Sequence, residues 1–221
     1  MEFGQVDLEA RLKTFYMANK FYDIAFTPSV KRAQEHYGSR RRFEKIEDGR
    51  EPAVALADAE IDFIERADGF YMATVGEQNQ PYVQFRGGRV GFLKVLDERT
   101  LGFADFRGNL QYISVGNLSV NNKVALFLMD YANRQRLKIF AETEVKDSAD
   151  VPELTAKLRD ESYEAKIERA VVLHVKAFNW NCPQHITPRY TMEQIKQMIE
   201  PLNEYVGKLE KEIKELKTQN L

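Results

Sequence analysis

The sequence predicts a mainly β protein with flanking helices, an α+β fold. Between residues 70 and 178, six or seven segments have the alternation or the apolar composition of strands, and short polar turns join most of them. Helical patterns gather before and after this region instead of separating every pair of strands. Short connections favour antiparallel pairing in a meander or barrel, and they argue against a doubly wound parallel sheet.

The composition excludes several classes of protein. The 221 residues suffice for one domain with appendages. The formal net charge of −2 argues against a dedicated nucleic-acid binder, and no apolar run reaches the length of a membrane span. Cys182 is the only cysteine, which excludes an internal disulfide, and the N-terminus has no signal-peptide apolar core. We expect a cytoplasmic protein with neither nucleic acid nor membrane as a partner.

Residues 1–69 are expected to form an N-terminal helical segment that packs on the barrel. Thr27 and Pro28 are typical of an N-cap and a first helical position, and Gly38 is typical of a helix end. Two further helices are expected to begin at Asp7 and Asp58, and they carry apolar stripes of Leu8, Leu12, Phe15 and of Ile61, Ile64. The basic run 39–42 is expected to be solvated surface, and 47–52 a loop.

Residues 70–190 contain the expected strands. In the second strand, 82–86, Val83 and Phe85 form an apolar face that we expect in the core, opposite a polar face of Tyr82, Gln84 and Arg86. Two glycines follow, where backbone can approach a ligand closely. The other expected strands are 70–75, 91–96, 101–105, 124–129, 136–145 and 170–178, and a helix is expected at 152–160.

Two of these strands have distinctive patterns. Residues 124–129 are apolar without interruption, which predicts burial on both faces. Residues 136–145 alternate, so that Leu137, Ile139 and Ala141 lie on one face and Arg136, Lys138 and Phe140 on the other.

A candidate anion site follows the fourth strand. Arg107–Ser114 combines a cation, a glycine and amide side chains with the start of a helix expected to run to Leu118. Cations, backbone N–H groups and a helix N-terminus together suit a phosphate. An ordinary surface loop is the alternative. In the irregular segment 180–190, Cys182 and His185 have no second ligand set or orienting acid, so we expect neither a metal nor a nucleophile there.

Residues 191–221 follow a heptad pattern. One core position holds Met192, Ile199, Val206 and Ile213, and the other holds Ile195, Leu202, Leu209 and Leu216. Mostly β-branched residues at the first position with mostly leucine at the second favour a two-stranded parallel coiled coil. Glu212 and Lys217 have the spacing of an interhelical charge pair, and Pro201 predicts a break between two helices. An amphipathic helix packed on its own barrel is the alternative.

Three strings in the chain resemble the pyridoxamine 5′-phosphate oxidase-related FMN-binding proteins, and more narrowly an uncharacterised branch of that superfamily. They are GRVGFLKVLDERTLGFADFRGNLQYISVGNL, VALFLMDYANRQRLKIFAE and FNWNCPQHITPRYT. The resemblance covers residues 21–216. It implies a split β-barrel, a homodimer and FMN bound at the subunit interface, with a small-molecule substrate that it does not identify. Related barrels accept a deazaflavin or haem instead of FMN.

The resemblance also places candidate cofactor contacts on this chain. FMN needs charge neutralisation at its phosphate, polar groups along the flavin edge and a flat apolar contact. The residues expected to bind it are Arg86, Gly87, Gly88, Asp105, Asn109, Gln111, Tyr112, Ser114, Asn133, Arg134, Arg136, His185 and Arg189. No catalytic residue is assigned.

The chain departs from the authentic oxidases at two places. Those enzymes end in an Arg-x-His motif and a basic segment, whereas here His185 and Arg189 occur in another order, before the heptads. Gln111 and Tyr112 stand where the family has a phosphate-binding basic pair. These departures argue against vitamin B6 oxidation. Two functions remain: an FMN-dependent oxidoreductase of unknown substrate, and a non-catalytic flavin sensor or interaction protein that uses its coiled coil.

Overall fold

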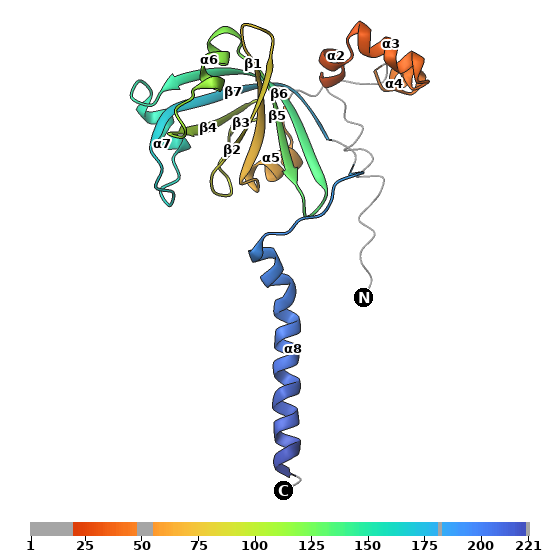
Figure 1. Ribbon diagram of the computed structural model, residues 1–221, viewed down its shortest axis with the longest axis vertical. Coiled ribbons are helices and arrows are strands. Elements are labelled where there is room, and N and C mark those ends of the chain that lie inside the picture. The colour runs from red at the N-terminus through yellow and green to blue at the C-terminus, as the bar shows by residue number, and fades with distance from the viewer. Residues whose placement is uncertain (1–19, 48–54, 181–182, 220–221) are drawn as a thin grey trace. The chain divides into compact units, whose positions relative to one another are not determined.

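The computed structural model in Figure 1 describes residues 20–47, 55–180 and 183–219. The helix expected at Asp7 and the side chain of Cys182 lie outside these ranges. The chain divides into two compact units. The first comprises residues up to Asp130 together with Gln135–Pro183, and the second comprises Tyr131–Arg134 together with the residues from Gln184 onward.

The first unit contains one seven-stranded sheet in the order β2-β1-β5-β6-β7-β4-β3. All of its strand pairs are antiparallel. Within the described residues no ladder joins the edge strands β2 and β3, so the barrel is split. The predicted fold, mainly β with flanking helices, is confirmed. The strands are β1 Gly69–Val75, β2 Pro81–Gly87, β3 Lys94–Asp97, β4 Thr100–Phe106, β5 Lys123–Asp130, β6 Gln135–Asp147 and β7 Ile167–Trp180.

The inner faces of the strands share one apolar core. Phe70 and Met72 of β1, Phe103 of β4 and Leu126 of β5 are buried in it. Burial of this apolar surface is the main stabilising contribution to such a curled sheet. The alternation predicted for residues 136–145 is confirmed, because the buried residues of β6 in this range include Leu137, Ile139 and Ala141.

The expected faces of β2 are wrong. Val83 and Phe85 are 59% and 55% exposed, whereas Gln84 and Arg86 are half-buried. The ladder with β1 gives the reason, because Gln84 pairs with buried Met72 and Arg86 with buried Phe70. Paired residues of an antiparallel ladder share one face of the sheet. The alternation was predicted correctly, but it is the polar face that turns inward.

The outward sides of β1, β2, β5 and β6 form an outer apolar face. It consists of Tyr71, Ala73, Val83, Phe85, Ala125, Phe127 and Phe140, with Lys138 among them. Burial of β5 on both faces is therefore a wrong prediction, since Ala125 and Phe127 lie on this face and are only half-buried. The ring of Phe21 stacks on Phe140 at a centroid distance of 4.6 Å, so the first described helix covers part of the face.

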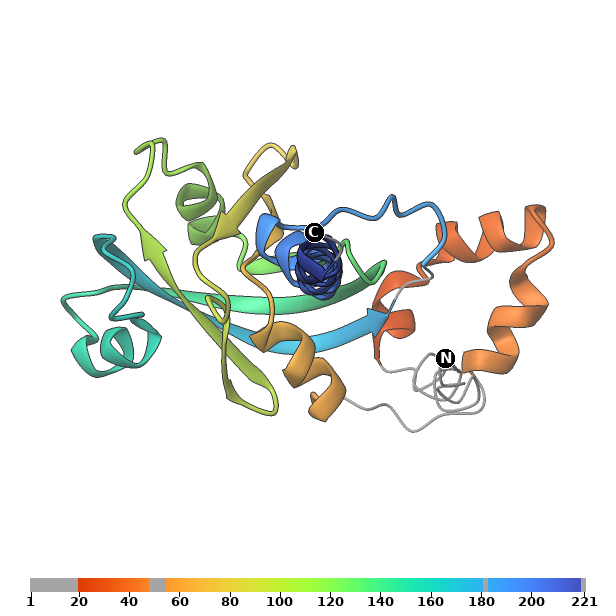
Figure 2. The ribbon, with the colours of Figure 1, turned by 90° about the horizontal axis from the view of Figure 1, so that it is seen from below.

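Among the described residues, four helices precede the sheet: α2 Phe21–Ala25, α3 Pro28–His36, α4 Arg40–Glu47 and α5 Asp58–Glu65. The start of α3 is as predicted, because the Val30 N–H donates to the Thr27 hydroxyl at 3.4 Å. The basic run is not merely solvated surface. It begins α4, where Arg40 pairs with Glu44 and Glu47. Helix α5 packs beside β3 (Figure 2). Its Ile64 side chain is completely buried.

Two helices interrupt the strands, α6 Ile113–Val120 and α7 Pro152–Leu158. The strand expected at 91–96 begins later, because Gly91 has φ +77° in a turn that precedes β3. In the second unit, α8 Met192–Gln219 is one helix with Pro201 inside it, so the predicted break is wrong. A proline removes one backbone hydrogen bond, which a long helix can survive. No helix within the described ranges has the length and apolar character needed to cross a membrane.

Candidate functional site

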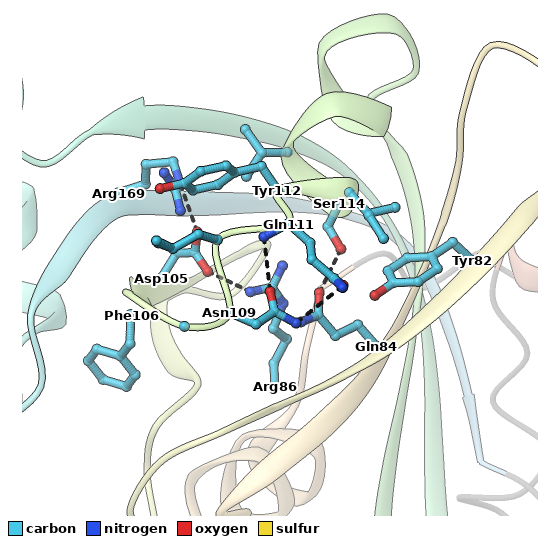
Figure 3. A pocket seen from close by; sticks show the side chains of 14 residues that line it. Tyr82, Gln84, Arg86, Asp105, Phe106, Asn109, Gln111, Tyr112, Ser114 and Arg169 are labelled. Carbon is cyan, nitrogen blue, oxygen red and sulfur yellow. Dashed lines mark hydrogen bonds and ion pairs between the residues drawn. The ribbon is translucent and has the colours of Figure 1, made fainter.

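A polar pocket of about 50 Å³ lies in the first unit, and Figure 3 shows its side chains. It is bordered by β2, the end of β4, the loop that leads into α6, the first turn of α6, and β7. The lining residues are Tyr82, Gln84, Arg86, Asp105, Phe106, Gly108, Asn109, Leu110, Gln111, Tyr112, Ile113, Ser114, Val115 and Arg169.

The polar face of β2 points toward the inside of the barrel and forms one wall of the pocket. Gln84 and Arg86 project from this face, where neither can be fully solvated. The hydroxyl of Ser114 at the start of α6 donates to Oε1 of Gln84 at 3.0 Å, and Ser114 itself is buried. This bond ties β2 to α6, which are far apart in sequence.

A buried carboxylate organises the charged side of the pocket. Asp105 is 3% exposed, and its two oxygens accept from different arginines. Arg86 Nη1 donates to Oδ1 at 2.6 Å, and Arg169 Nε donates to Oδ2 at 2.7 Å. A carboxylate is buried at acceptable cost only when its lone pairs are used in this way. We call Arg86 and Arg169 the arginine pair.

The pKa of Arg169 is raised, and the guanidinium of Arg86 is incompletely satisfied. Burial lowers the pKa of Arg169, but its hydrogen bond to Asp105 and the nearby charges of Asp105 and Glu168 outweigh this effect, so the pKa is raised. The Nε atom of Arg86 is buried and has no hydrogen-bond partner within the described residues. A buried N–H without an acceptor costs about 1–3 kcal/mol, which an incoming acceptor oxygen would recover.

The loop before α6 has an unusual backbone. Leu110 and Tyr112 have φ of +62° and +53°, in the left-handed region that is costly for such side chains. Between them, the Gln111 N–H donates to Asn109 Oδ1 at 3.1 Å. Tyr112 is the N-cap residue of α6, but its side chain makes no capping bond. The first N–H groups of a helix have no partner within the helix, so they can serve a ligand.

Six of the predicted contact residues line this pocket: Arg86, Asp105, Asn109, Gln111, Tyr112 and Ser114. Gly87 and Gly88 follow at the end of β2 without lining it. A Cβ atom on either glycine would come within 2.7 Å of Phe85 or Phe92, so packing accounts for both. Arg136 lies on β6, opposite Met129.

The other four predicted residues belong to the second unit. Asn133 and Arg134 lie in the turn between β5 and β6, and His185 and Arg189 lie before α8. Arg134 and His185 both have left-handed backbones, with φ of +55° and +62°. The Arg189 guanidinium lies 5.0 Å from the centre of the Tyr131 ring within this unit.

Among the lining residues with polar or charged side chains, three were not predicted from the sequence: Tyr82, Gln84 and Arg169. Tyr82 and Gln84 lie on the same polar face of β2 as Arg86, so the alternation along this strand could have identified them as lining residues. Arg169 had no such signal, because only the register of β4 with β7 places it opposite Asp105. Within the described ranges, no group of three or more His, Cys, Asp or Glu side chains could hold a metal ion.

The fold is therefore a split β-barrel whose edge strand β2 lines a pocket that contains two arginines. Such a pocket is suited to an anionic ligand. Residues 56–182 match the family model described as Pyridoxamine 5'-phosphate oxidase, and the chain belongs to this family. No curated protein matches the chain.

Several solved structures are similar to it. HupZ of Group A Streptococcus is 14% identical with a TM-score of 0.47, and the match covers 61% of this chain and 99% of that one. An FMN-binding protein of Syntrophomonas wolfei is 12% identical with a TM-score of 0.44, over 67% and 97% of the two chains. HutZ, a haem storage protein of Vibrio cholerae, is 14% identical with a TM-score of 0.36, over 56% and 93%.

Proposed function

We propose that this protein binds FMN, with the phosphate ester in the pocket beside the arginine pair. The observation that carries the proposal is the unsatisfied Nε–H of Arg86, next to a carboxylate that already serves two guanidiniums. Charge-assisted bonds from arginine to phosphate are among the strong kind. Membership of the pyridoxamine 5′-phosphate oxidase family supports a flavin as the ligand.

The pocket accommodates only part of FMN. Its volume of about 50 Å³ is far below the ~300–1,000 Å³ typical of sites that enclose a whole small-molecule ligand. We therefore place the phosphate in it, with Gln84, Gln111 and Ser114 as polar groups near the ester. The flavin ring would lie beyond the pocket, where a second copy of the chain completes the site.

The outer apolar face is the surface that we assign to this second copy. It gathers three exposed aromatic or aliphatic side chains, Tyr71, Val83 and Phe85, beside half-buried Phe127 and Phe140. A contiguous exposed apolar patch on a soluble domain is typical of an interaction site. A two-fold dimer uses the same patch on both copies, so one apolar face can cover another. We propose a homodimer with FMN at the subunit interface.

The proposed activity is electron transfer between FMN and a small substrate that remains to be identified. Bound FMN would supply hydride or single-electron chemistry, and the protein would supply binding and orientation. The arginine pair would fix the phosphate end, and Asp105 would fix the arginine pair. The departures at His185, Arg189, Gln111 and Tyr112 argue against vitamin B6 as the substrate. The single cysteine suits a cytoplasmic location.

A second candidate function is a flavin sensor or interaction protein. The observation that favours it is helix α8, whose heptad residues Ile199, Leu202, Val206, Leu209, Ile213 and Leu216 are all exposed. A 28-residue helix with such a stripe suits pairing with a second copy as a parallel coiled coil. Glu212 and Lys217 would then form a charge pair between the two helices. In this function the flavin would report a state and not turn over.

The experiment that tests the proposal uses flavin-stripped full-length protein. FMN is titrated while flavin fluorescence is followed, and the complex is then mixed anaerobically with a reduced nicotinamide. Saturable binding followed by bleaching of the flavin supports the oxidoreductase. Binding without reduction by any donor tested favours the sensor. Absence of saturable binding at micromolar flavin contradicts both candidates.

A further inference from the structure

The structure points to a second anion-binding residue, Arg169, which the sequence pattern did not reveal. We propose that Arg169 and Arg86 hold the phosphate ester together, and that Arg169 makes the site prefer a phosphorylated flavin over an uncharged one. This inference rests on the proposed flavin function and deepens it. It assigns the cation that the chain lacks at Gln111 and Tyr112.

The arginine pair connects strands that are not neighbours. Arg86 lies on β2, at one end of the strand order, whereas Asp105 lies on β4 near the other end, and Arg169 lies on β7 next to β4. No ladder within the described residues joins β2 to β4. The 2.6 Å contact between Arg86 and Asp105 therefore bridges the split of the barrel with side chains alone. The pocket lies at this bridge (Figure 3).

The charges at the bridge favour an anion. Asp105 accepts from both guanidiniums, and Glu168 accepts from Nη2 of Arg169 at 3.0 Å. Glu168 is also 3.7 Å from Arg107, which offsets its charge. One carboxylate between two guanidiniums leaves positive charge in a place with little solvent, where Coulomb interactions are stronger than in water.

Arg169 is held in a fixed orientation. Nε and Nη2 donate to Asp105 and Glu168, and the guanidinium carbon lies 5.0 Å from the centre of the Tyr112 ring. Tyr112 is the residue at the start of α6, so this contact sets the arginine beside the uncapped helix start. A guanidinium has five N–H donors, so both arginines retain N–H groups beyond those that the carboxylates accept. A rigid, planar guanidinium can donate two parallel hydrogen bonds to a phosphate, whereas the ammonium group of a lysine cannot.

A purely structural ion network is the competing explanation for these contacts. In that case Arg169 would only stabilise the packing of β7 against β4. Its loss would then destabilise the barrel and weaken the binding of FMN and riboflavin by the same factor. The two explanations differ in the ratio of the riboflavin and FMN dissociation constants. Riboflavin lacks the phosphate, so this ratio isolates the phosphate contact, and riboflavin binding also reports whether a variant is folded.

The test measures both dissociation constants by flavin fluorescence on flavin-stripped full-length protein. For wild type we expect FMN to bind more tightly than riboflavin. For Arg169→Gln we expect the ratio to fall about 10- to 100-fold, the usual effect of losing a charged hydrogen bond, with riboflavin binding retained. The matched control is Arg99→Gln, which removes an exposed arginine of the β3–β4 turn that does not line the pocket, and its ratio should equal that of wild type.

Each outcome decides the inference. An unchanged ratio in Arg169→Gln overturns the inference about Arg169 but does not contradict the proposed flavin-binding function. Equal affinities of wild type for both flavins also overturn it, whereas failure to bind either flavin contradicts the proposed function itself. If Arg169→Gln does not fold, Arg169→Lys decides instead. Lysine keeps the charge but loses the fork, so a ratio lowered at least about threefold supports the inference and a wild-type ratio overturns it.

Discussion

Replacement of Asp105 by asparagine tests whether the buried carboxylate holds the split of the barrel together. Asp105 is 3% exposed and accepts one bond from each arginine, at 2.6 and 2.7 Å. In Asp105→Asn one oxygen remains as an acceptor, and the amide N–H₂ replaces the other and faces a guanidinium donor. We therefore expect the loss of one charged hydrogen bond and a new unsatisfied donor.

The magnitude follows from these two effects. A hydrogen bond to a charged group contributes about 1.5–3 kcal/mol, and an unsatisfied buried polar group costs about 1–3 kcal/mol. Together they predict that Asp105→Asn lowers the free energy of unfolding by about 3–5 kcal/mol, the range seen when a buried ion pair is broken. The assay is urea unfolding followed by circular dichroism, with the midpoint and slope fitted for each protein.

The control for this prediction is Glu98→Gln. Glu98 is 63% exposed and pairs with exposed Arg99 at 3.4 Å, so its replacement should cost less than about 1 kcal/mol. A loss of under 1 kcal/mol for Asp105→Asn as well would refute the reasoning, because the network would then be no stronger than a surface ion pair.

Other predictions concern the cofactor and the subunits. Arg86→Ala should weaken FMN binding about 30- to 1000-fold in a fluorescence titration, because it removes the unsatisfied donor at the pocket, and unchanged affinity would remove Arg86 from the site. The preference for FMN over riboflavin should rise between pH 5 and pH 7.5. The reason is that the phosphate ester loses its second proton near a pKa of about 6, while the raised pKa of Arg169 keeps that side chain charged. A preference that does not change with pH would contradict a phosphate dianion in the pocket. Val83→Glu should convert the dimer into a folded monomer of 25.6 kDa in light scattering, and an unaffected dimer would exclude the outer apolar face. With Cys182 replaced by serine, Ile213→Cys should form an intersubunit disulfide rapidly and Lys211→Cys slowly, whereas equal rates would contradict pairing along the heptad stripe.

Much of the fold could be predicted from local patterns. The alternation along β6, the cap at Thr27 and the short turns of the sheet each depend on neighbouring residues, so the sequence contains their signal. The faces of β2 could not be assigned in this way. Alternation separates two faces without indicating which of them is inside, and this sheet has apolar residues on both sides.

The candidate site was predicted in part for the same reason. Arg86 and the segment 105–114 stand out because glycine, amide and charged residues cluster there in sequence. Arg169 is 64 residues away from Asp105, and only the ladder between β4 and β7 brings them together. The start of α4 was missed because three consecutive arginines suggested a solvated surface. In the structure Arg40 forms ion pairs with two glutamates of its own helix.

The central claim, that this barrel holds FMN, is tested most directly by the purified protein itself. The absorbance spectrum of the full-length protein is recorded, the protein is denatured, and the mass of the released chromophore is measured. We predict the spectrum of an oxidised flavin and the mass of FMN, at up to one molecule per chain. Release of haem or a deazaflavin, or failure of the colourless protein to take up added FMN, would contradict the claim.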